Sequence, residues 1–281
     1  MAKIIAIANQ KGGVGKTTTS VNLSACLAAA EKRTLLIDLD PQGNASSCLG
    51  VEKETFAKDN VYHALINEES WDSCIYKTEL PLLDLCPSNN DLVGAELELV
   101  HMFARESKLK VALESLHSKY DYIIIDCAPS LNLLTVNAFT AAHTYLVPMQ
   151  TEYLAMEGLS QLLNTVRLIR ASLNPKLTLE GILLTMYDSR NNLCKLVAND
   201  LMTHFKDDIL KSIIPRNVKL SECTSFGKPI ILYDITSKGS EAYLSLAREI
   251  ILKSEKKPET NQVKMPLNQQ IPKFEDYQVQ P

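Results

Sequence analysis

The strongest constraint on the fold is a glycine-rich segment that joins a predicted strand to a predicted helix. The apolar run Lys3–Ala8 passes directly into NQKGGVGKTT (residues 9–18), and helical spacing of apolar residues begins at once behind it. Glycines let backbone N–H groups turn inward around phosphate oxygens, a lysine adds a point charge, and the helix N-terminus adds partial positive charge. The segment therefore predicts a phosphate-binding loop inside a strand–loop–helix unit.

Two lysines and a threonine give this loop its chemistry. We expect Lys16 to contact the β and γ phosphates of a nucleotide and the Thr17 hydroxyl to bind Mg²⁺. The general pattern has glycine where this chain has Gln10, and a second lysine, Lys11, precedes the glycines. Because a second cation is hard to place within its own site, we expect Lys11 to reach the nucleotide of a neighbouring subunit. A solvated surface lysine is the alternative. The predicted nucleotide-binding residues are Lys11, Gly12, Gly13, Val14, Gly15, Lys16, Thr17 and Thr18.

Three acidic residues stand at or just beyond the ends of two further predicted strands. Asp38 and Asp40 lie two residues apart, so we expect them to project together beside Lys16 if their strand neighbours the first. Mg²⁺ and an attacking water would compensate these two buried acids. Asp126 ends the apolar strand Tyr122–Asp126. In P-loop NTPases, the acid that supports Mg²⁺ likewise stands at the end of an apolar strand. Capping of the next helix is the alternative role for Asp126.

Short apolar runs and helical stretches alternate along the 281 residues. This order predicts the α/β class: a doubly wound, mostly parallel sheet with helices on both faces and ligands at the carboxyl ends of the strands. The expected strands are Lys3–Ala8, Thr34–Leu39, Leu82–Cys86, Tyr122–Asp126, Thr144–Met149, Leu179–Met186 and Ile209–Ile214. The expected helices are Thr18–Lys32, Arg105–Lys119, Leu131–Ala141, Tyr153–Ser172, Asn192–Phe205 and Lys238–Lys253.

The chain is expected to form one domain over residues 1–254, followed by a tail. Residues 255–281 hold four prolines and many polar residues, which predicts disorder there. Seven scattered cysteines, with no CxxC pair, argue against a disulfide framework and a zinc site and favour a reducing cytosol. No apolar stretch is long enough for a signal peptide or a membrane span, so we expect a soluble cytoplasmic protein.

The overall charge is acidic, which excludes a protein that coats nucleic acid through its net charge. Lys and Arg total 29 against 33 Asp and Glu, giving a net charge of -4. Residues 190–228 differ, because seven basic and four acidic residues give +3 there and leave -7 for the rest. Any DNA binding is therefore expected to be local, weak and dependent on salt.

Six segments together resemble the ParA/Soj family of partition ATPases, which has a deviant Walker A loop and belongs to the MinD/ParA class of P-loop NTPases. The resemblance covers residues 3 to about 253. The loop and the acidic segments are shared across that class, whereas the last three segments are more typical of ParA. The six segments are KGGVGKTTTSVNL (11–23), LLIDLDPQGN (35–44), IIIDCAPSL (123–131), EGLSQLLNTVRLI (157–169), IPRNVKLSE (214–222) and GKPIILYD (227–234).

The resemblance implies an ATPase that binds ATP with Mg²⁺, pairs as a homodimer across the nucleotides, and then binds double-stranded DNA without sequence preference on the nucleoid. A ParB-type partner would stimulate hydrolysis. By the same resemblance, Lys11 would contact phosphates across the dimer interface, and Asp40 would position the hydrolytic water. Thr17 would coordinate Mg²⁺ directly, with Asp126 in support.

Four further residues receive roles from the resemblance. Pro215 and Asn217 would border the adenine. Arg190 and Lys219 fall where relatives place DNA-contacting arginines. The second is lysine here, which neutralises a phosphate but does not bind it in a bidentate way.

Three alternatives remain at this stage. A MinD-like membrane ATPase needs a C-terminal amphipathic helix, and residues 255–281 offer no apolar stripe for one, so no membrane contact is expected. An iron–sulfur reductase of the nitrogenase-iron-protein type needs paired cysteines, which the sequence does not suggest. A cargo-positioning or regulatory ATP switch shares the whole core and stays open.

Overall fold

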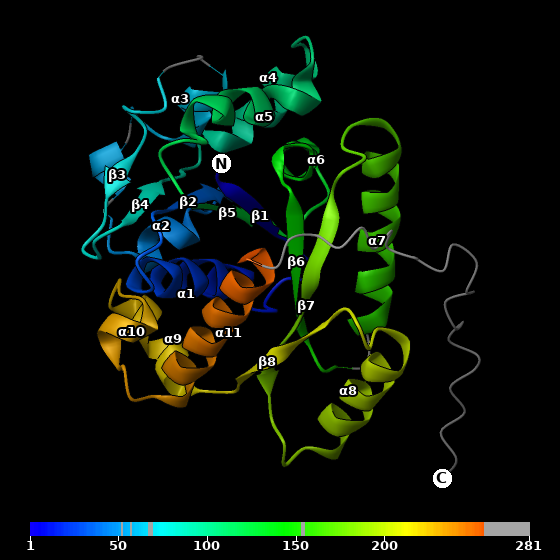
Figure 1. The fold of residues 1–281 in the computed structure, drawn as a ribbon. Coiled ribbons are helices and arrows are strands. Elements are labelled where there is room, and N and C mark those ends of the chain that lie inside the picture. Colours follow the sequence, from blue (N-terminus) through cyan, green and yellow to red (C-terminus); the bar gives the residue numbers. More distant parts are fainter. Residues whose placement is uncertain (52, 57, 67–69, 153–154, 256–281) are drawn as a thin grey trace.

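The computed structural model describes residues 1–51, 53–56, 58–66, 70–152 and 155–255. Within them, eight strands form one sheet in the order β3-β4-β2-β5-β1-β6-β7-β8 (Figure 1). All neighbours pair in parallel except β3 with β4. The strands are β1 (Lys3–Ile7), β2 (Thr34–Leu39), β3 (Tyr76–Lys77), β4 (Leu83–Cys86), β5 (Tyr122–Cys127), β6 (Thr144–Gln150), β7 (Thr178–Tyr187) and β8 (Ile209–Pro215). The tail was predicted to begin at residue 255, but Glu255 is the last residue of helix α11 (Lys238–Glu255). The rest of the predicted tail, residues 256–281, lies outside the described residues.

Helices cover both faces of this sheet (Figure 1). None of the described helices is both long enough and apolar enough to cross a lipid bilayer. The α-helices are α1 (Lys16–Ala29), α2 (Asn44–Cys48), α3 (Val61–Ile66), α4 (Leu92–Val100), α5 (Lys108–Leu113), α6 (Leu133–Ala141), α7 (Ala155–Ser172), α8 (Asn192–His204), α9 (Val218–Ser225), α10 (Ile230–Tyr233) and α11 (Lys238–Glu255). The 3₁₀ helices are η1 (Lys53–Phe56), η2 (Arg105–Ser107) and η3 (Glu114–Leu116).

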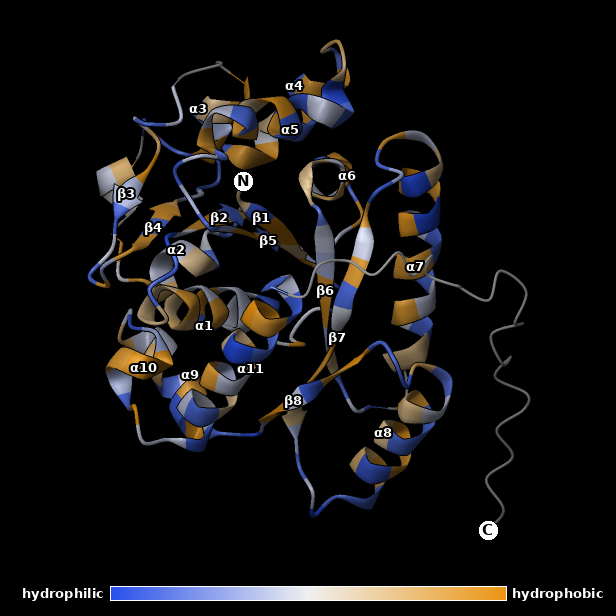
Figure 2. Ribbon diagram, in the orientation of Figure 1, coloured by the Kyte–Doolittle hydropathy of each residue, from blue (hydrophilic) through white to orange (hydrophobic). Residues whose placement is uncertain are grey.

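The sheet separates two hydrophobic cores. Successive side chains of a strand point to opposite faces, so Ile123 and Ile125 of β5 join the core beneath α3–α8, and Ile124 joins the core beneath α1 and α11. All six residues of β5 are buried, as expected for a central parallel strand. In Figure 2, α7 has hydrophobic and hydrophilic residues on different sides, and its buried side includes Leu162 and Val166. The doubly wound α/β architecture is confirmed.

The structure departs from the sequence-based picture at three elements. Strand β5 lies between β1 and β2, so the strand that carries Asp38 does not neighbour the first strand. The predicted helix Arg105–Lys119 is divided into η2, α5 and η3. The expected strand Ile209–Ile214 forms β8, which is an edge strand on which Lys211 is exposed. Apolar content alone does not distinguish an edge strand from a central one.

The central strand provides a test of the core. Ile124 is fully buried, and Ile124→Ala should lower the free energy of unfolding by about 2–5 kcal/mol, because it removes apolar contacts and leaves a cavity. Leu168 of α7 is 66% exposed, and Leu168→Ala should change that free energy by less than about 0.5 kcal/mol. Urea unfolding followed by circular dichroism measures both. Equal effects would contradict this placement of β5.

Candidate nucleotide-binding site

The glycine-rich loop joins the carboxyl end of β1 to the first residue of α1. Gly13 and Gly15 adopt φ values of 73° and 87°, a left-handed conformation that glycine adopts without steric cost. Apart from the adjoining residues, no heavy atom of the described residues lies within 4 Å of the position that a Cβ on Gly12 would occupy. An open concave backbone in front of a helix N-terminus fits a bound phosphate group.

Neighbouring strands hold this loop in place. The Asn9 side-chain amide donates a hydrogen bond of 2.7 Å to the carbonyl of Pro148 in β6. The Thr185 hydroxyl of β7 donates one of 2.8 Å to the carbonyl of Val14. Because both partners belong to the sheet, the loop is positioned before any ligand binds, which lowers the entropy cost of binding.

Lys16 crosses the loop from its place at the start of α1. Its side chain is buried, and Nζ donates a 3.0 Å hydrogen bond to the carbonyl of Lys11. Burial lowers the pKa of Lys16, whereas the negative charges of Asp126 and Asp40 act in the opposite direction. A phosphate oxygen is a stronger acceptor for an ammonium group than a carbonyl, so a bound nucleotide can take the place of the Lys11 carbonyl.

Asp126 lies at the base of the site, fully buried near the end of β5. The Ser20 hydroxyl of α1 donates a 2.7 Å hydrogen bond to Asp126 Oδ1. Burial raises the pKa of the Asp126 carboxyl, and the hydroxyls of Ser20 and Thr17 oppose that rise. Among the described residues, Asp126 Oδ2 has no hydrogen-bond partner with normal geometry.

A buried carboxylate oxygen without a donor fits a Mg²⁺ ion or one of its waters. Thr17 and Asp126 are therefore the side chains that would hold Mg²⁺. Within the described part of the chain, no group of three or more His, Cys, Asp and Glu residues could bind a metal by itself. Mg²⁺ is usually held by one or two protein ligands together with substrate phosphates, which agrees with this sparse set.

Asp38 and Asp40 lie in different surroundings, although the sequence suggested that they act together. Asp38 is fully buried, and its Oδ2 accepts hydrogen bonds of 2.9 and 2.7 Å from the backbone and hydroxyl of Ser46. Burial and the charge of Asp126 raise the pKa of Asp38. Its donors come from the protein, so it needs no metal for compensation, contrary to our expectation. Asp40 Oδ1 accepts only a backbone N–H, that of Gln42 at 3.0 Å, within the described residues.

The side chain of Lys11 pairs with a residue outside its own loop. Its ammonium group forms an ion pair with Glu152, just after β6, and both side chains are partly exposed. This placement leaves Lys11 at the surface on the carboxyl side of the sheet. An exposed ion pair of this kind contributes little stability, so another anion can replace Glu152.

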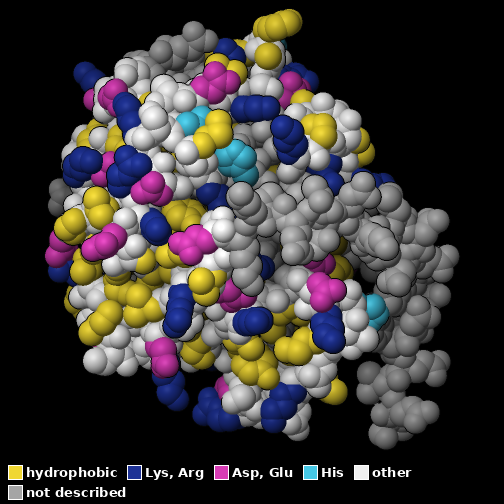
Figure 3. All heavy atoms as spheres, in the orientation of Figure 1, with side chains coloured by type: hydrophobic (Ala, Val, Ile, Leu, Met, Phe, Trp, Pro, Cys, Tyr) yellow, Lys and Arg dark blue, Asp and Glu magenta, His cyan; other side chains and the backbone are white. Residues whose placement is uncertain are grey.

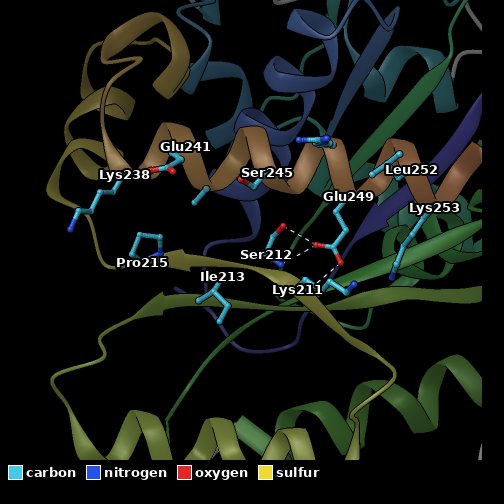
Figure 4. A pocket seen from close by; sticks show the side chains of 12 residues that line it. Lys211, Ser212, Ile213, Pro215, Lys238, Glu241, Ser245, Glu249, Leu252 and Lys253 are labelled. Atoms are coloured by element: carbon cyan, nitrogen blue, oxygen red, sulfur yellow. Dashed lines mark hydrogen bonds between the residues drawn. The ribbon is translucent and has the colours of Figure 1, made fainter.

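The two residues expected at the adenine lie at the end of β8 and the start of α9. Pro215 pairs in register with Tyr187, and Asn217 caps α9 by accepting a 2.8 Å hydrogen bond from the backbone of Lys219. This bond uses the Asn217 carbonyl and leaves its amide N–H groups as donors. Pro215 also lines one end of a groove of about 860 Å³ between β8 and α11 (Figure 4).

That groove is distinct from the phosphate loop, which contributes no residue to it. Figure 4 shows Glu249 pointing from α11 toward β8, where its carboxylate accepts hydrogen bonds of 2.9 Å from the backbones of Lys211 and Ser212. Both donors are backbone N–H groups of the edge strand β8. Glu249 therefore satisfies two backbone donors of this strand.

Both residues expected to contact DNA are paired with a carboxylate. Arg190 forms a bidentate ion pair with Asp188, with distances of 2.9 and 2.8 Å. Lys219 Nζ lies 2.8 Å from Glu222 and 5.7 Å from the ring centre of Tyr233. Arg190 lowers the pKa of Asp188, so this carboxylate is charged at neutral pH. The local positive charge is thus partly compensated within the chain.

Sequence reasoning missed three residues that shape the site. Ser20 lies one helical turn beyond Lys16 and donates a hydrogen bond to Asp126. The helical period places Ser20 on the same side of α1 as Lys16, so it could have been found once Asp126 was assigned to the site. Glu152 follows the carboxyl end of a predicted strand, which is a usable signal. Thr185 contacts Val14 from 171 positions along the chain, and no pattern in the sequence reveals such a contact.

Comparison with known proteins agrees with this geometry. A family profile described as an AAA domain matches residues 2–179. "Chromosome partitioning protein ParA" of Myxococcus xanthus (strain DK1622) is 55% identical over 251 residues, covering 89% of this chain and 88% of that protein. The chain belongs to the ParA/Soj family of P-loop ATPases. "Sporulation initiation inhibitor protein Soj" of Bacillus subtilis (strain 168) is 56% identical over 250 residues, covering 89% of this chain and 98% of the relative.

A solved structure connects the ParA/Soj fold to a ligand. Cobyrinic acid a,c-diamide synthase from Mycobacterium smegmatis, solved with bound ADP and magnesium, is 36% identical with a TM-score of 0.80, and the match covers 91% of this chain and 96% of that one. The two relatives named for ParA and Soj are more similar in sequence than this synthase. The resemblance first suggested by the sequence motifs is therefore confirmed.

Lys16 provides the direct test of the site. Lys16→Ala should weaken ATP binding by about tenfold or more, because a hydrogen bond to a charged group contributes about 1.5–3 kcal/mol. Fluorescence titration with a labelled ATP analogue measures this, with Lys110→Ala, an exposed lysine on α5, as the control. Unaltered ATP turnover in Lys16→Ala would contradict the assignment.

Proposed function

We propose that this ParA/Soj family ATPase segregates DNA by cycling between a monomer and an ATP-bound homodimer. In the proposal, the dimer binds double-stranded DNA without sequence preference, and a ParB-type DNA-binding partner stimulates hydrolysis and releases it. Association with the nucleoid follows from that binding. The observation that supports the proposal is a glycine-rich loop crossed by Lys16, together with a second loop lysine, Lys11, that is paired with Glu152 outside the loop.

Hydrolysis of ATP is assigned to the carboxyl edge of the sheet. Lys16 and the loop N–H groups neutralise phosphate charge as it develops on the leaving oxygens. Bound Mg²⁺ would supply further positive charge to the phosphates. Asp40 is the residue proposed to orient the attacking water, because it lies in the field of Lys16 and carries no donor from a protein side chain among the described residues.

We assign dimerisation to Lys11, because its ammonium group can exchange the Glu152 carboxylate for a phosphate of the other subunit. In the monomer, the ammonium group is paired with Glu152. In the proposed dimer, it leaves Glu152 for the phosphates of the opposite subunit, which carry more negative charge and accept stronger hydrogen bonds. ATP then favours the dimer over ADP, because its γ phosphate adds negative charge with which Lys11 can replace Glu152.

DNA binding is assigned to Arg190 and Lys219. Each is already paired with a carboxylate of the same chain. Its contact with a DNA phosphate therefore contributes less binding free energy than the contact of an unpaired cation would. Such contacts give weak, salt-sensitive binding. Dimerisation places two copies of both residues in one particle, so binding becomes measurable only in the ATP-bound state.

Asp40→Ala tests the assignment of hydrolysis. It should slow ATP turnover by about hundredfold, the typical contribution of a positioned base, and leave ATP binding and the dimer intact. Turnover is measured by phosphate release and the dimer by light scattering, with Asp207→Ala, on an exposed loop, as the control. Failure of Asp40→Ala to bind ATP or dimerise would rule out this role.

A charge reversal tests the DNA surface. Arg190→Glu with Lys219→Glu should abolish the gel shift seen with ATP at low salt, while ATP-dependent dimerisation persists. Lys110→Glu with Lys176→Glu makes the same change of charge at two other exposed positions and should retain the shift. Running the gels at two salt concentrations identifies phosphate contacts by their steep salt dependence. Equal affinity of the first double variant and the parent would place the DNA surface elsewhere.

A further inference from the structure

Helix α4 is apolar on the side that faces solvent as well as on the side that faces the core. Leu92, Ala95 and Leu99 are buried in the core that α3–α8 share. Val93, Leu97 and Val100 follow the spacing i, i+4, i+7, so they share the opposite side of the helix. Their exposed fractions are 57%, 73% and 50%, and Phe103 just beyond is 95% exposed.

This outer row, Val93, Leu97, Val100 and Phe103, is called the α4 row below. Helix α4 lies in the outer layer with α3 and α5 (Figure 1), and hydrophobic side chains stand out at the top of the molecule above it (Figure 3). A helix that is apolar on both sides is normally covered on both. Single exposed apolar residues need no explanation, but a continuous row marks an interaction surface.

Acidic side chains outnumber basic ones near the α4 row, where Arg105 donates a hydrogen bond to the Val100 carbonyl and is itself paired with Glu106. Between Lys77 and Arg105 the chain contains no lysine or arginine and five acidic residues. Of these, Asp91, Glu96 and Glu98 belong to α4 or its N-cap. Each accepts a hydrogen bond from a neutral side chain, those of Asn89, Asn132 and Tyr62 respectively. None of the three forms an ion pair with Lys or Arg within the described residues, so their charges are available to a partner.

The exposed apolar row and the carboxylates near it together indicate what kind of molecule can bind to this surface. DNA is excluded because its phosphates would meet three carboxylates. A protein helix with apolar residues on one side and lysine or arginine beside them matches both the row and the charges. We propose that the α4 row docks a basic amphipathic segment of the ParB-type activator; the identity of this partner rests on the proposed function.

The surface is connected to the nucleotide site. The Glu96 carboxylate of α4 accepts a hydrogen bond from Asn132, the N-cap of α6. Asn132 follows Asp126 by six residues, so α4 contacts the segment that leaves the proposed Mg²⁺ site. A partner bound to α4 would therefore contact a helix that is hydrogen-bonded to Asn132. Through this hydrogen bond, binding at α4 could affect hydrolysis at the nucleotide site.

The test uses the full chain with ATP and the full-length ParB-type protein encoded in the same genome. Leu97→Ser with Phe103→Ser should raise the activator concentration for half-maximal ATPase stimulation by tenfold or more. Both side chains are exposed, so basal turnover, ATP-dependent dimerisation and DNA binding should stay within twofold of the parent. Leu168→Ser, a leucine of similar exposure on α7, is the matched control and should leave stimulation unchanged.

A charge variant tests the second half of the inference. Glu98→Gln should weaken stimulation by a few-fold and reduce its dependence on salt, because one carboxylate no longer attracts the basic segment. Unchanged stimulation of Leu97→Ser with Phe103→Ser would overturn the α4 proposal and leave the proposed function intact. Absence of stimulation in the parent protein would instead overturn the activator in the proposed function. A loss of dimer, DNA or lipid-vesicle binding in the double variant would assign the row to that occupant and overturn the docking of a protein activator.

Discussion

The architecture of the site depends on compensation of one buried charge. Asp126 lies fully buried at the centre of the sheet, where an unpaired carboxylate is costly. Ser20 and Lys16, both from α1, provide a donor and a positive charge, while Oδ2 remains without a donor among the described residues. The start of α1, the phosphate loop and the end of β5 are therefore held in one arrangement, which a nucleotide with Mg²⁺ would complete.

The three cations that the proposed function assigns to contacts with other molecules are each paired with a carboxylate of their own chain. Lys11 is paired with Glu152, Arg190 with Asp188, and Lys219 with Glu222. Each must exchange an internal carboxylate for an external phosphate, and the difference between the two interactions is small compared with either alone. Small differences make such contacts easy to reverse, which suits the proposed cycle of DNA binding and release.

Much of the site could be predicted from the sequence because its determinants are local. The phosphate loop, Lys16 and Thr17 lie within one strand–loop–helix unit, and Asp126 ends an unbroken run of β-branched residues. Strand order could not be predicted in this way. Insertion of β5 between β1 and β2 depends on which hydrophobic faces pack together over long separations, and adjacent strands in the chain need not be adjacent in space. The division of Arg105–Lys119 and the edge position of β8 escaped prediction for the same reason.

The sequence by itself determined the α/β class, the phosphate loop and the family, because these follow from residue spacing and from motifs that are contiguous in the chain. Only the tertiary structure separated Asp38 from Asp40, since that distinction depends on Ser46 supplying donors to one acid alone. It also decided that Lys11 meets Glu152, 141 positions away, and that the row on α4 faces solvent. These outcomes depend on contacts between distant segments, and the free energy of such contacts is set by packing in three dimensions.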